Sequence, residues 1–131
     1  MKRIPALIST LIIIMIVSGI LLAGCASGGN IYGTYEGTLP CADCEGIQTT
    51  LTLDNKKCFK LEEAYLGEEV SPFVTEGTWA VDSSGKISLA PSDDSDESRY
   101  YEVVSENELR MLDRTGNKIE SELNYSLIKK Q

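Results

Sequence analysis

From Ile31 onward, apolar and polar residues alternate in short runs. The clearest run is 47–53, in which Ile47, Leu51 and Leu53 fall on one face of an extended strand. In this region no window keeps the apolar period of about 3.6 residues that an amphipathic helix shows. The pattern therefore predicts strands rather than helices.

Two further runs show the same alternation. Phe59, Leu61 and Tyr65 share one face of a second strand, and Trp79 and Val81 share one face of a third. Residues that favour turns separate the runs. We expect strands over 31–39, 47–53, 58–66, 73–82, 86–90, 98–105, 108–113 and 122–129.

Eight short strands joined mostly by tight connections predict an all-β domain over 31–131. Closing such a meander into a small antiparallel β-barrel removes its exposed edges, and a β-sandwich is the alternative. A barrel of this size is either filled by side chains or holds one small ligand. The sequence leaves both arrangements open.

The first part of the chain has a different pattern. Lys2 and Arg3 precede an uncharged apolar stretch over 4–23, and small residues lead to Cys25. This order is typical of an export signal, and a Cys directly after the small residues indicates a lipoprotein signal peptide over 1–24. An uncleaved membrane helix is the alternative, although several polar residues weaken it.

Lipidation of Cys25 would anchor the mature protein to a membrane. Each buried CH₂ group contributes about 0.8 kcal/mol, so two or three acyl chains hold a small protein firmly. Ala26, rather than Asp, follows the Cys, which resembles the sorting pattern of outer-membrane lipoproteins in Gram-negative bacteria. We expect a short flexible tether over 25–30 that reaches about 20 Å and keeps the folded part near the membrane.

Composition narrows the classes of function. Without residues 1–24 the chain has 107 residues, enough for one domain with one core. Lys2 and Arg3 are two of the 12 basic residues, so 10 remain against 20 acidic ones, a formal charge of −10. Such a surface repels nucleic acid and suits a basic protein face or cations. The chain has no histidine, which removes the Ser–His and Cys–His nucleophile pairs, and we expect no enzymatic activity.

Cys41 and Cys44 form a C-x-x-C pair between the first two predicted strands, and three interpretations compete. A structural disulfide fits an oxidising envelope, although closing a four-residue loop contributes only about 2 kcal/mol. A redox-active dithiol is disfavoured because Asp43 and Glu45 flank the thiols with negative charge. Two thiolates also suit Cu(I), which accepts low coordination numbers, whereas zinc would need further ligands.

Cys58 is left over once Cys25 carries lipid. Along the predicted strand, Cys58 alternates with Phe59 and Leu61 and so lies on the opposite face. A free thiol on the outer face is therefore the first interpretation. A disulfide with Cys41 or Cys44 is the alternative.

A longer stretch identifies a family. Residues 33–47 are similar to the opening of the NlpE N-terminal domain, a copper-homeostasis lipoprotein family, and the similarity centres on the run Leu39-Pro40-Cys41-Ala42-Asp43-Cys44. Segment 76–79 is similar to its middle strand, and segments 110–113 and 119–125, with Gly116 between them, are similar to its closing strands. The resemblance covers nearly all of 33–130.

The resemblance implies a lipocalin-like β-barrel on a lipid anchor, with a role in envelope stress signalling, copper tolerance and surface sensing. It also implies an envelope sensor kinase as a partner, because in two-domain members the N-terminal domain is thought to meet one. We expect this chain to depart from those members in lacking a second domain and in having Cys58.

The leading hypothesis is a non-enzymatic envelope protein whose Cys41/Cys44 pair reports metal or redox state. Metal binding or loss of the disulfide would loosen the corner between the first two strands and change the face shown to a partner. A lipocalin-like carrier of a small apolar ligand is one alternative. A structural lipoprotein whose disulfide only stabilises the domain is the other.

Overall fold

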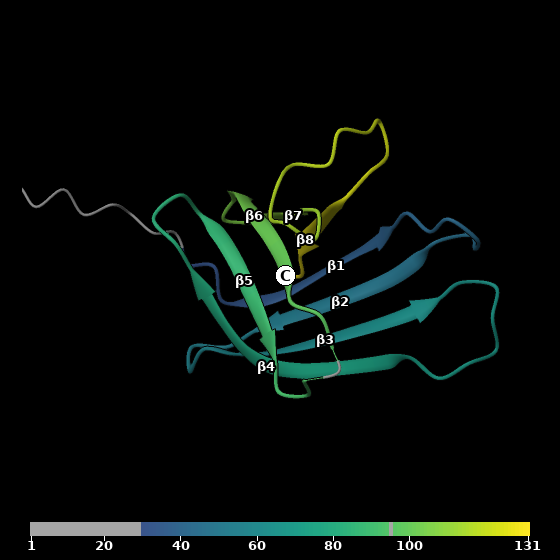
Figure 1. The fold of residues 1–131 in the computed structure, drawn as a ribbon, viewed down its shortest axis with the longest axis horizontal. Helices are drawn as coiled ribbons and strands as arrows, with labels where there is room; N and C mark the ends of the chain where they lie inside the picture. Colours follow the sequence, from purple (N-terminus) through teal and green to yellow (C-terminus); the bar gives the residue numbers. More distant parts are fainter. Residues whose placement is uncertain (1–29, 95) are drawn as a thin grey trace, which may run out of the picture.

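Eight antiparallel strands form a closed barrel in a computed structural model that describes residues 30–94 and 96–131 (Figure 1). The strands follow one another around the barrel in chain order, and β1 pairs with β8 to close it. Their bounds are β1 (Gly33–Leu39), β2 (Ile47–Leu53), β3 (Cys58–Tyr65), β4 (Phe73–Val81), β5 (Lys86–Pro91), β6 (Arg99–Ser105), β7 (Glu108–Met111) and β8 (Ser126–Lys129). The prediction of an all-β meander barrel is confirmed.

Most strand ends agree with the predicted ones to within two residues, but β8 is much shorter than the run expected over 122–129. The Leu123 N–H donates to Ser121 Oγ at 3.1 Å, and the Ser126 N–H donates to Asn124 Oδ1 at 3.0 Å. Such local side-chain bonds compete with a sheet ladder. The segment ahead of Ser126 therefore folds as an irregular connection.

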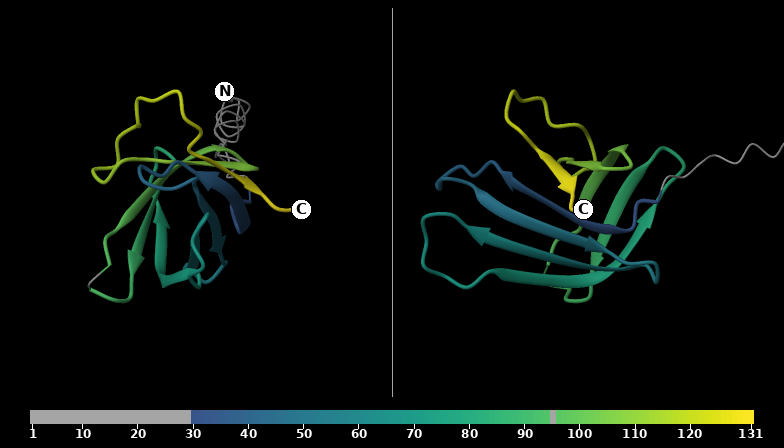
Figure 2. Two further views of the ribbon diagram at one scale, coloured as in Figure 1. Left: turned by 90° about the vertical axis from the view of Figure 1, so that its right-hand side faces the viewer. Right: turned by 180° about the vertical axis from the view of Figure 1, so that it is seen from behind.

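The barrel has two unlike ends. One end, called the turn end, carries the tight connections 54–57, 82–85 and 106–107, and Asn30 lies on this side because β1 starts there. The other end, called the open end, carries the connections 40–46, 66–72, 92–98 and 112–125. β1 to β4 extend past β5 to β8 toward the open end (Figure 2, right).

Apolar side chains from all eight strands fill the interior, which the strands surround in the end-on view (Figure 2, left). The buried core consists of Tyr35, Leu39, Leu51, Leu53, Phe59, Leu61, Trp79, Ile87, Leu89, Tyr101, Leu109 and Leu127. The expected inward face of 47–53 is present, and Thr49 is buried on it as well. Trp79 and Val81 lie two residues apart on β4, as the predicted shared face requires, but Val81 is the last residue of the strand and is 40 % exposed.

Asp54, Asp82 and Asp113 each begin a turn of the same geometry. In each turn the Asp carbonyl accepts a hydrogen bond from the N–H three residues on, and Oδ1 accepts from the N–H groups two and four residues on. The carboxylate thus satisfies backbone donors that the tight turn leaves unpaired. At Asp54 and Asp82 this arrangement closes the tight connections 54–57 and 82–85, whereas the Asp113 turn lies within the longer 112–125 connection.

We expect two of these turns to make the barrel sensitive to acid. The Ser84 hydroxyl and backbone N–H groups hold the pKa of Asp82 below its ordinary value, and the Asn117 N–H and Thr115 hydroxyl do the same for the pKa of Asp113. A lowered pKa means that the folded state favours the carboxylate. Its stabilising effect is present above the ordinary Asp pKa of about 3.9 and is lost as the pH falls through the lowered values.

Thermal unfolding of the wild type and of an Asp82→Asn/Asp113→Asn variant, measured at a series of pH values, checks this expectation. The wild type should have the higher Tm at neutral pH, and the difference should shrink as the pH falls from about 5 to about 2. Asp94→Asn serves as a control, since Asp94 lies outside these turns. A Tm difference that does not change with pH would show that the two carboxylates have no such effect.

Among the residues that the structure describes, there is no helix of the length and hydropathy that a membrane crossing requires.

Candidate functional site

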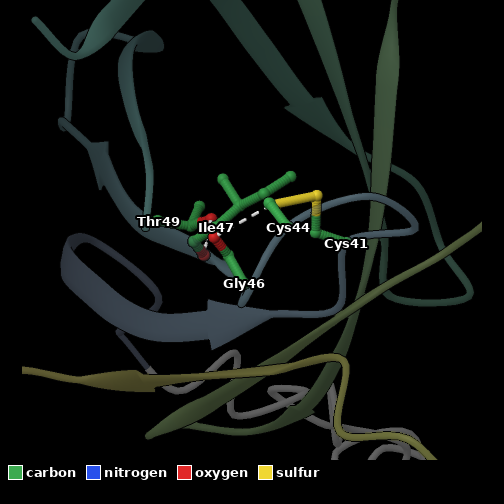
Figure 3. Close-up of a disulfide and its surroundings, with 5 residues drawn as sticks. All are labelled: Cys41, Cys44, Gly46, Ile47 and Thr49. Carbon is green, nitrogen blue, oxygen red and sulfur yellow. Dashed lines mark hydrogen bonds between the residues drawn. A yellow bond between two sulfur atoms is a disulfide. The ribbon is translucent and has the colours of Figure 1, made fainter. Parts of the chain in front are cut away.

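The C-x-x-C pair lies in the connection between β1 and β2, at the open end. The Cys41 and Cys44 sulfur atoms are joined in a disulfide, with the two Cα atoms 5.3 Å apart (Figure 3). Leu39 and Ile47 form the last cross-strand pair before the loop, so the disulfide caps the end of a long two-stranded ladder. Both cysteines are half-buried, and Asp43 between them is exposed.

Gly46 connects this loop to the next connection at the open end. Its carbonyl oxygen accepts a hydrogen bond from the Leu66 N–H at 2.9 Å, and Cys44 Sγ lies 3.3 Å from the same oxygen (Figure 3). A disulfide sulfur carries no hydrogen, so only the reduced Cys44 thiol could donate to this carbonyl. Gly46 has φ +151°, and a Cβ here would lie 2.6 Å from Thr38 Cγ2. The loop therefore needs glycine at this position.

The structure separates Cys58 from the pair. Cys58 begins β3 at the turn end, where it is exposed and not bonded to another cysteine of the described residues. The pair lies at the opposite end of β2, a seven-residue strand that spans about 20 Å. A disulfide between Cys58 and Cys41 or Cys44, or a shared zinc site, would need the barrel to come apart.

No metal-binding cluster accompanies the pair. The residues that the structure describes include no group of three Cys, Asp or Glu side chains placed to hold one ion. A Cu(I) site would therefore rest on the two thiolates alone and would require the disulfide to be reduced first.

An ion pair between a buried carboxylate and a half-buried arginine joins two strands across the barrel, and the sequence did not predict it. The Arg99 guanidinium donates from Nη1 to Glu63 Oε1 at 2.8 Å and from Nη2 to Glu63 Oε2 at 3.2 Å. β3 and β6 are not neighbours, so the pair joins two distant walls. Glu63 is 8 % exposed, and the arginine provides the partner that a buried carboxylate needs.

Tyr101 lies near this ion pair. Its hydroxyl is buried and has no hydrogen-bond partner among the described residues. Burial raises the pKa of Tyr101, so its hydroxyl stays neutral.

The sequence gives one signal for the Glu63–Arg99 ion pair. Glu63 alternates with Leu61 and Tyr65, so it occupies an inward position on β3. Its partner could not be read from the sequence, since only closure of the barrel brings Arg99 to it.

The predicted lipidation site Cys25, the signal over 1–24 and most of the tether lie outside the described residues. Asn30 lies a few residues before the start of β1, at the turn end, and the disulfide lies at the open end. A membrane anchor a few residues before Asn30 would therefore sit at the end of the barrel opposite to Cys41 and Cys44.

Comparison with known proteins agrees with this architecture. The sequence matches the NlpE N-terminal domain family over residues 35–122. It is 46 % identical over 96 residues to Lipoprotein NlpE of Escherichia coli strain K12, which covers 72 % of this chain and 39 % of that protein. A 17 kDa lipoprotein of Treponema pallidum is 35 % identical over 91 residues, which covers 64 % of this chain and 58 % of that protein.

Solved structures show the same fold. The crystal structure of a lipoprotein from Shewanella oneidensis matches with a TM-score of 0.63 and 47 % identity, covering 77 % of this chain and 90 % of that one. The structure of the Cpx pathway activator NlpE from Escherichia coli matches with a TM-score of 0.57 and 44 % identity, covering 76 % of this chain and 51 % of that one. The chain thus spans about two fifths of the Escherichia coli sequence. The residues of this chain that match the family include the C-x-x-C loop. By sequence and by fold, this chain belongs to the NlpE N-terminal domain family.

Proposed function

We propose that this protein is a lipid-anchored envelope protein that activates a stress response, and that the Cys41–Cys44 disulfide is its sensing element. Family membership supports the first part, since a relative that is 46 % identical is described as an activator of the Cpx pathway. The position of the disulfide in a half-buried loop supports the second part, because soluble reductants and metal ions reach such a loop. The partner would be an envelope sensor kinase.

The anchor completes the proposed geometry. Acylation of Cys25, with Ala26 after it, would place the protein on the outer membrane facing the periplasm. The chain enters the barrel at the turn end, so the open end with its disulfide would face away from that membrane. A partner in the periplasm or the opposite membrane would then meet the sensing loop first.

The proposed signal is local loosening at the open end. Reduction of the disulfide frees residues 41–44 from a tight loop, and Cu(I) binding to the two thiolates would hold them in the open form. The Gly46 carbonyl bonds to the Leu66 N–H, so a change in this loop would reach the 66–72 connection. A two-state element of this kind is what a sensor requires.

The single observation that carries the proposal is the disulfide between Cys41 and Cys44, in a loop that lies within the residues matching the family. The packed interior favours a sensor over the carrier alternative, because a carrier needs an internal cavity. A purely structural disulfide is the other alternative, and it predicts no effect of the thiols on signalling at equal protein level.

A reporter experiment in a bacterial host that lacks its own NlpE tests the proposal. The wild type, Cys41→Ser/Cys44→Ser and the matched control Cys58→Ser would be expressed with their signal peptides and challenged with copper. We expect the double variant to lose the copper-dependent change in the stress reporter and Cys58→Ser to keep it. Equal responses from all three proteins, at equal membrane levels, would leave the disulfide a structural role only.

A further inference from the structure

We propose that the exposed edge of β4 between Phe73 and Glu76 binds an extended segment of a partner protein that carries alternating apolar and basic residues. The edge exists because β4 is longer than β5. Residues 73–76 pair with β3 on one side, whereas pairing with β5 begins only at Gly77, opposite Pro91. Figure 1 shows this part of β4 at the border of the sheet, with no strand on its outer side.

The backbone groups on this edge can be assigned from the hydrogen bonds around it. The Glu76 carbonyl accepts from the Ser92 N–H on the β5 side, and the Trp79 N–H donates to the Lys57 carbonyl on the β3 side. In an antiparallel sheet the two backbone groups of a residue point to the same side and alternate along the strand. The Val74 N–H and C=O and the Glu76 N–H therefore point away from β3, where an added strand would pair with them.

The side chains on the edge are apolar and exposed. Phe73, Val74 and the nearby Val70 are 58, 52 and 51 % exposed. The Phe73 ring packs edge-on against Tyr65, with 5.7 Å between the ring centroids, so it is held in place. Exposed apolar edges are normally covered or charged, and peptide-binding domains use free strand edges to add a partner strand.

A pocket of ≈ 270 Å³ runs along the inner side of this edge. Its lining consists of Glu63, Tyr65, Phe73, Val74, Thr75, Asp96 and Arg99. Because side chains alternate along a strand, an added segment would place every second side chain toward this pocket.

The acidic residues around the edge indicate the charge of the partner. Glu76 lies on the edge itself, and Glu68 and Glu69 precede Val70 in the 66–72 connection. Glu62, opposite Val74 on β3, is paired with Lys60 at 3.2 Å, so Glu68, Glu69 and Glu76 supply most of the negative charge around the edge. A second copy of this chain would bring the same acidic groups together, which disfavours edge-to-edge pairing of two copies. A segment with Lys or Arg between its apolar residues complements both features.

This surface is separate from the disulfide loop, and its test does not depend on redox chemistry. The probe is a synthetic seven-residue peptide of alternating lysine and valine, and the control probe has proline at its centre. Both are titrated against the purified full chain in detergent micelles, by fluorescence anisotropy and by amide hydrogen exchange. We expect the first peptide to bind and to protect the amides of Val74 and Glu76, and the proline peptide to bind at least about tenfold more weakly because it lacks a ladder donor.

Two matched variants separate strand addition from general attraction to an acidic protein. Val74→Lys adds a positive charge on the edge, and Val104→Lys adds the same charge on an exposed position of β6. We expect Val74→Lys to weaken peptide binding about tenfold and Val104→Lys to weaken it less than about twofold. Equal losses, protection elsewhere, no binding at millimolar peptide, or a dimer formed through this edge would each overturn the proposal.

Discussion

Replacing Gly77 by alanine should destabilise the barrel by about 3 kcal/mol or more, because the added methyl group has no room. A Cβ at Gly77 would lie 2.1 Å from the Ala90 carbonyl oxygen and 2.8 Å from the Pro91 Cα. Both are backbone atoms of the neighbouring strand, so no side-chain rotation relieves the clash. The change should separate β4 from β5 at the point where their pairing begins.

Urea unfolding of a secreted version that begins at Ser27, followed by the fluorescence of the single tryptophan, measures this effect. Thr78→Ala is the matched control on the next residue of β4, since its side chain is exposed and its loss should cost less than about 0.5 kcal/mol. If Gly77→Ala unfolds at the same urea concentration as Thr78→Ala, β4 and β5 have room for a methyl group at this position and the expectation is wrong.

Gly77 has a counterpart on the other side of the long sheet. A Cβ at Gly37 would lie 2.6 Å from the Ser126 carbonyl oxygen, where β1 meets β8. The two glycines therefore stand where β1 and β4, the outer strands of the β1–β4 sheet, approach β8 and β5. The sequence alone does not show that either glycine allows two strands to approach closely, because a glycine inside a strand pattern also indicates a bulge or a locally weakened strand.

Local pattern was sufficient for most of the strands. The run over 47–53 was predicted residue for residue, because its alternation is regular and it ends at Asp54, which begins a tight turn. The exposed Val81 could not be foreseen, since alternation assigns a face but says nothing of where the barrel ends. Register and closure decide which inward positions are covered.

The candidate site was predictable to a different extent. The spacing of Cys41 and Cys44 marks a pair that can bond, and the structure joins them. The Glu63–Arg99 pair and the free edge of β4 depend on contacts between strands that are distant in sequence. Such contacts follow from strand lengths and closure, which a single sequence specifies only weakly.

Trp79→Ala should cost about 3–5 kcal/mol, the second large effect that we expect. Trp79 is 3 % exposed, and its Nε1 donates to the Asp54 carbonyl at 3.1 Å. Its ring also lies edge-on to Tyr32, with 5.9 Å between centroids. The alanine variant would leave a cavity at the turn end and remove one of the two hydrogen bonds that the Asp54 carbonyl accepts, the other being from the Lys57 N–H. Urea unfolding followed by circular dichroism would measure the loss.

Lys57 explains how this tryptophan also stabilises the turn beside it. Lys57 has φ +68° at the turn position that Gly85 and Gly116 occupy elsewhere, a conformation that costs a non-glycine residue about 1 kcal/mol. Its Nζ lies 4.0 Å from the centroid of a Trp79 ring, and such a cation–π contact contributes about 0.5–2 kcal/mol. The contact thus offsets the strained backbone.

A double-mutant cycle tests this balance. In the wild type, Lys57→Gly removes both the strain and the cation–π contact, so we expect a change in unfolding free energy near zero. In the Trp79→Ala background the contact is already absent, so Lys57→Gly should stabilise the protein by about 1 kcal/mol. The same stabilisation in both backgrounds would mean that Lys57 and Trp79 do not interact energetically, and that the positive φ of Lys57 is tolerated without compensation from the ring.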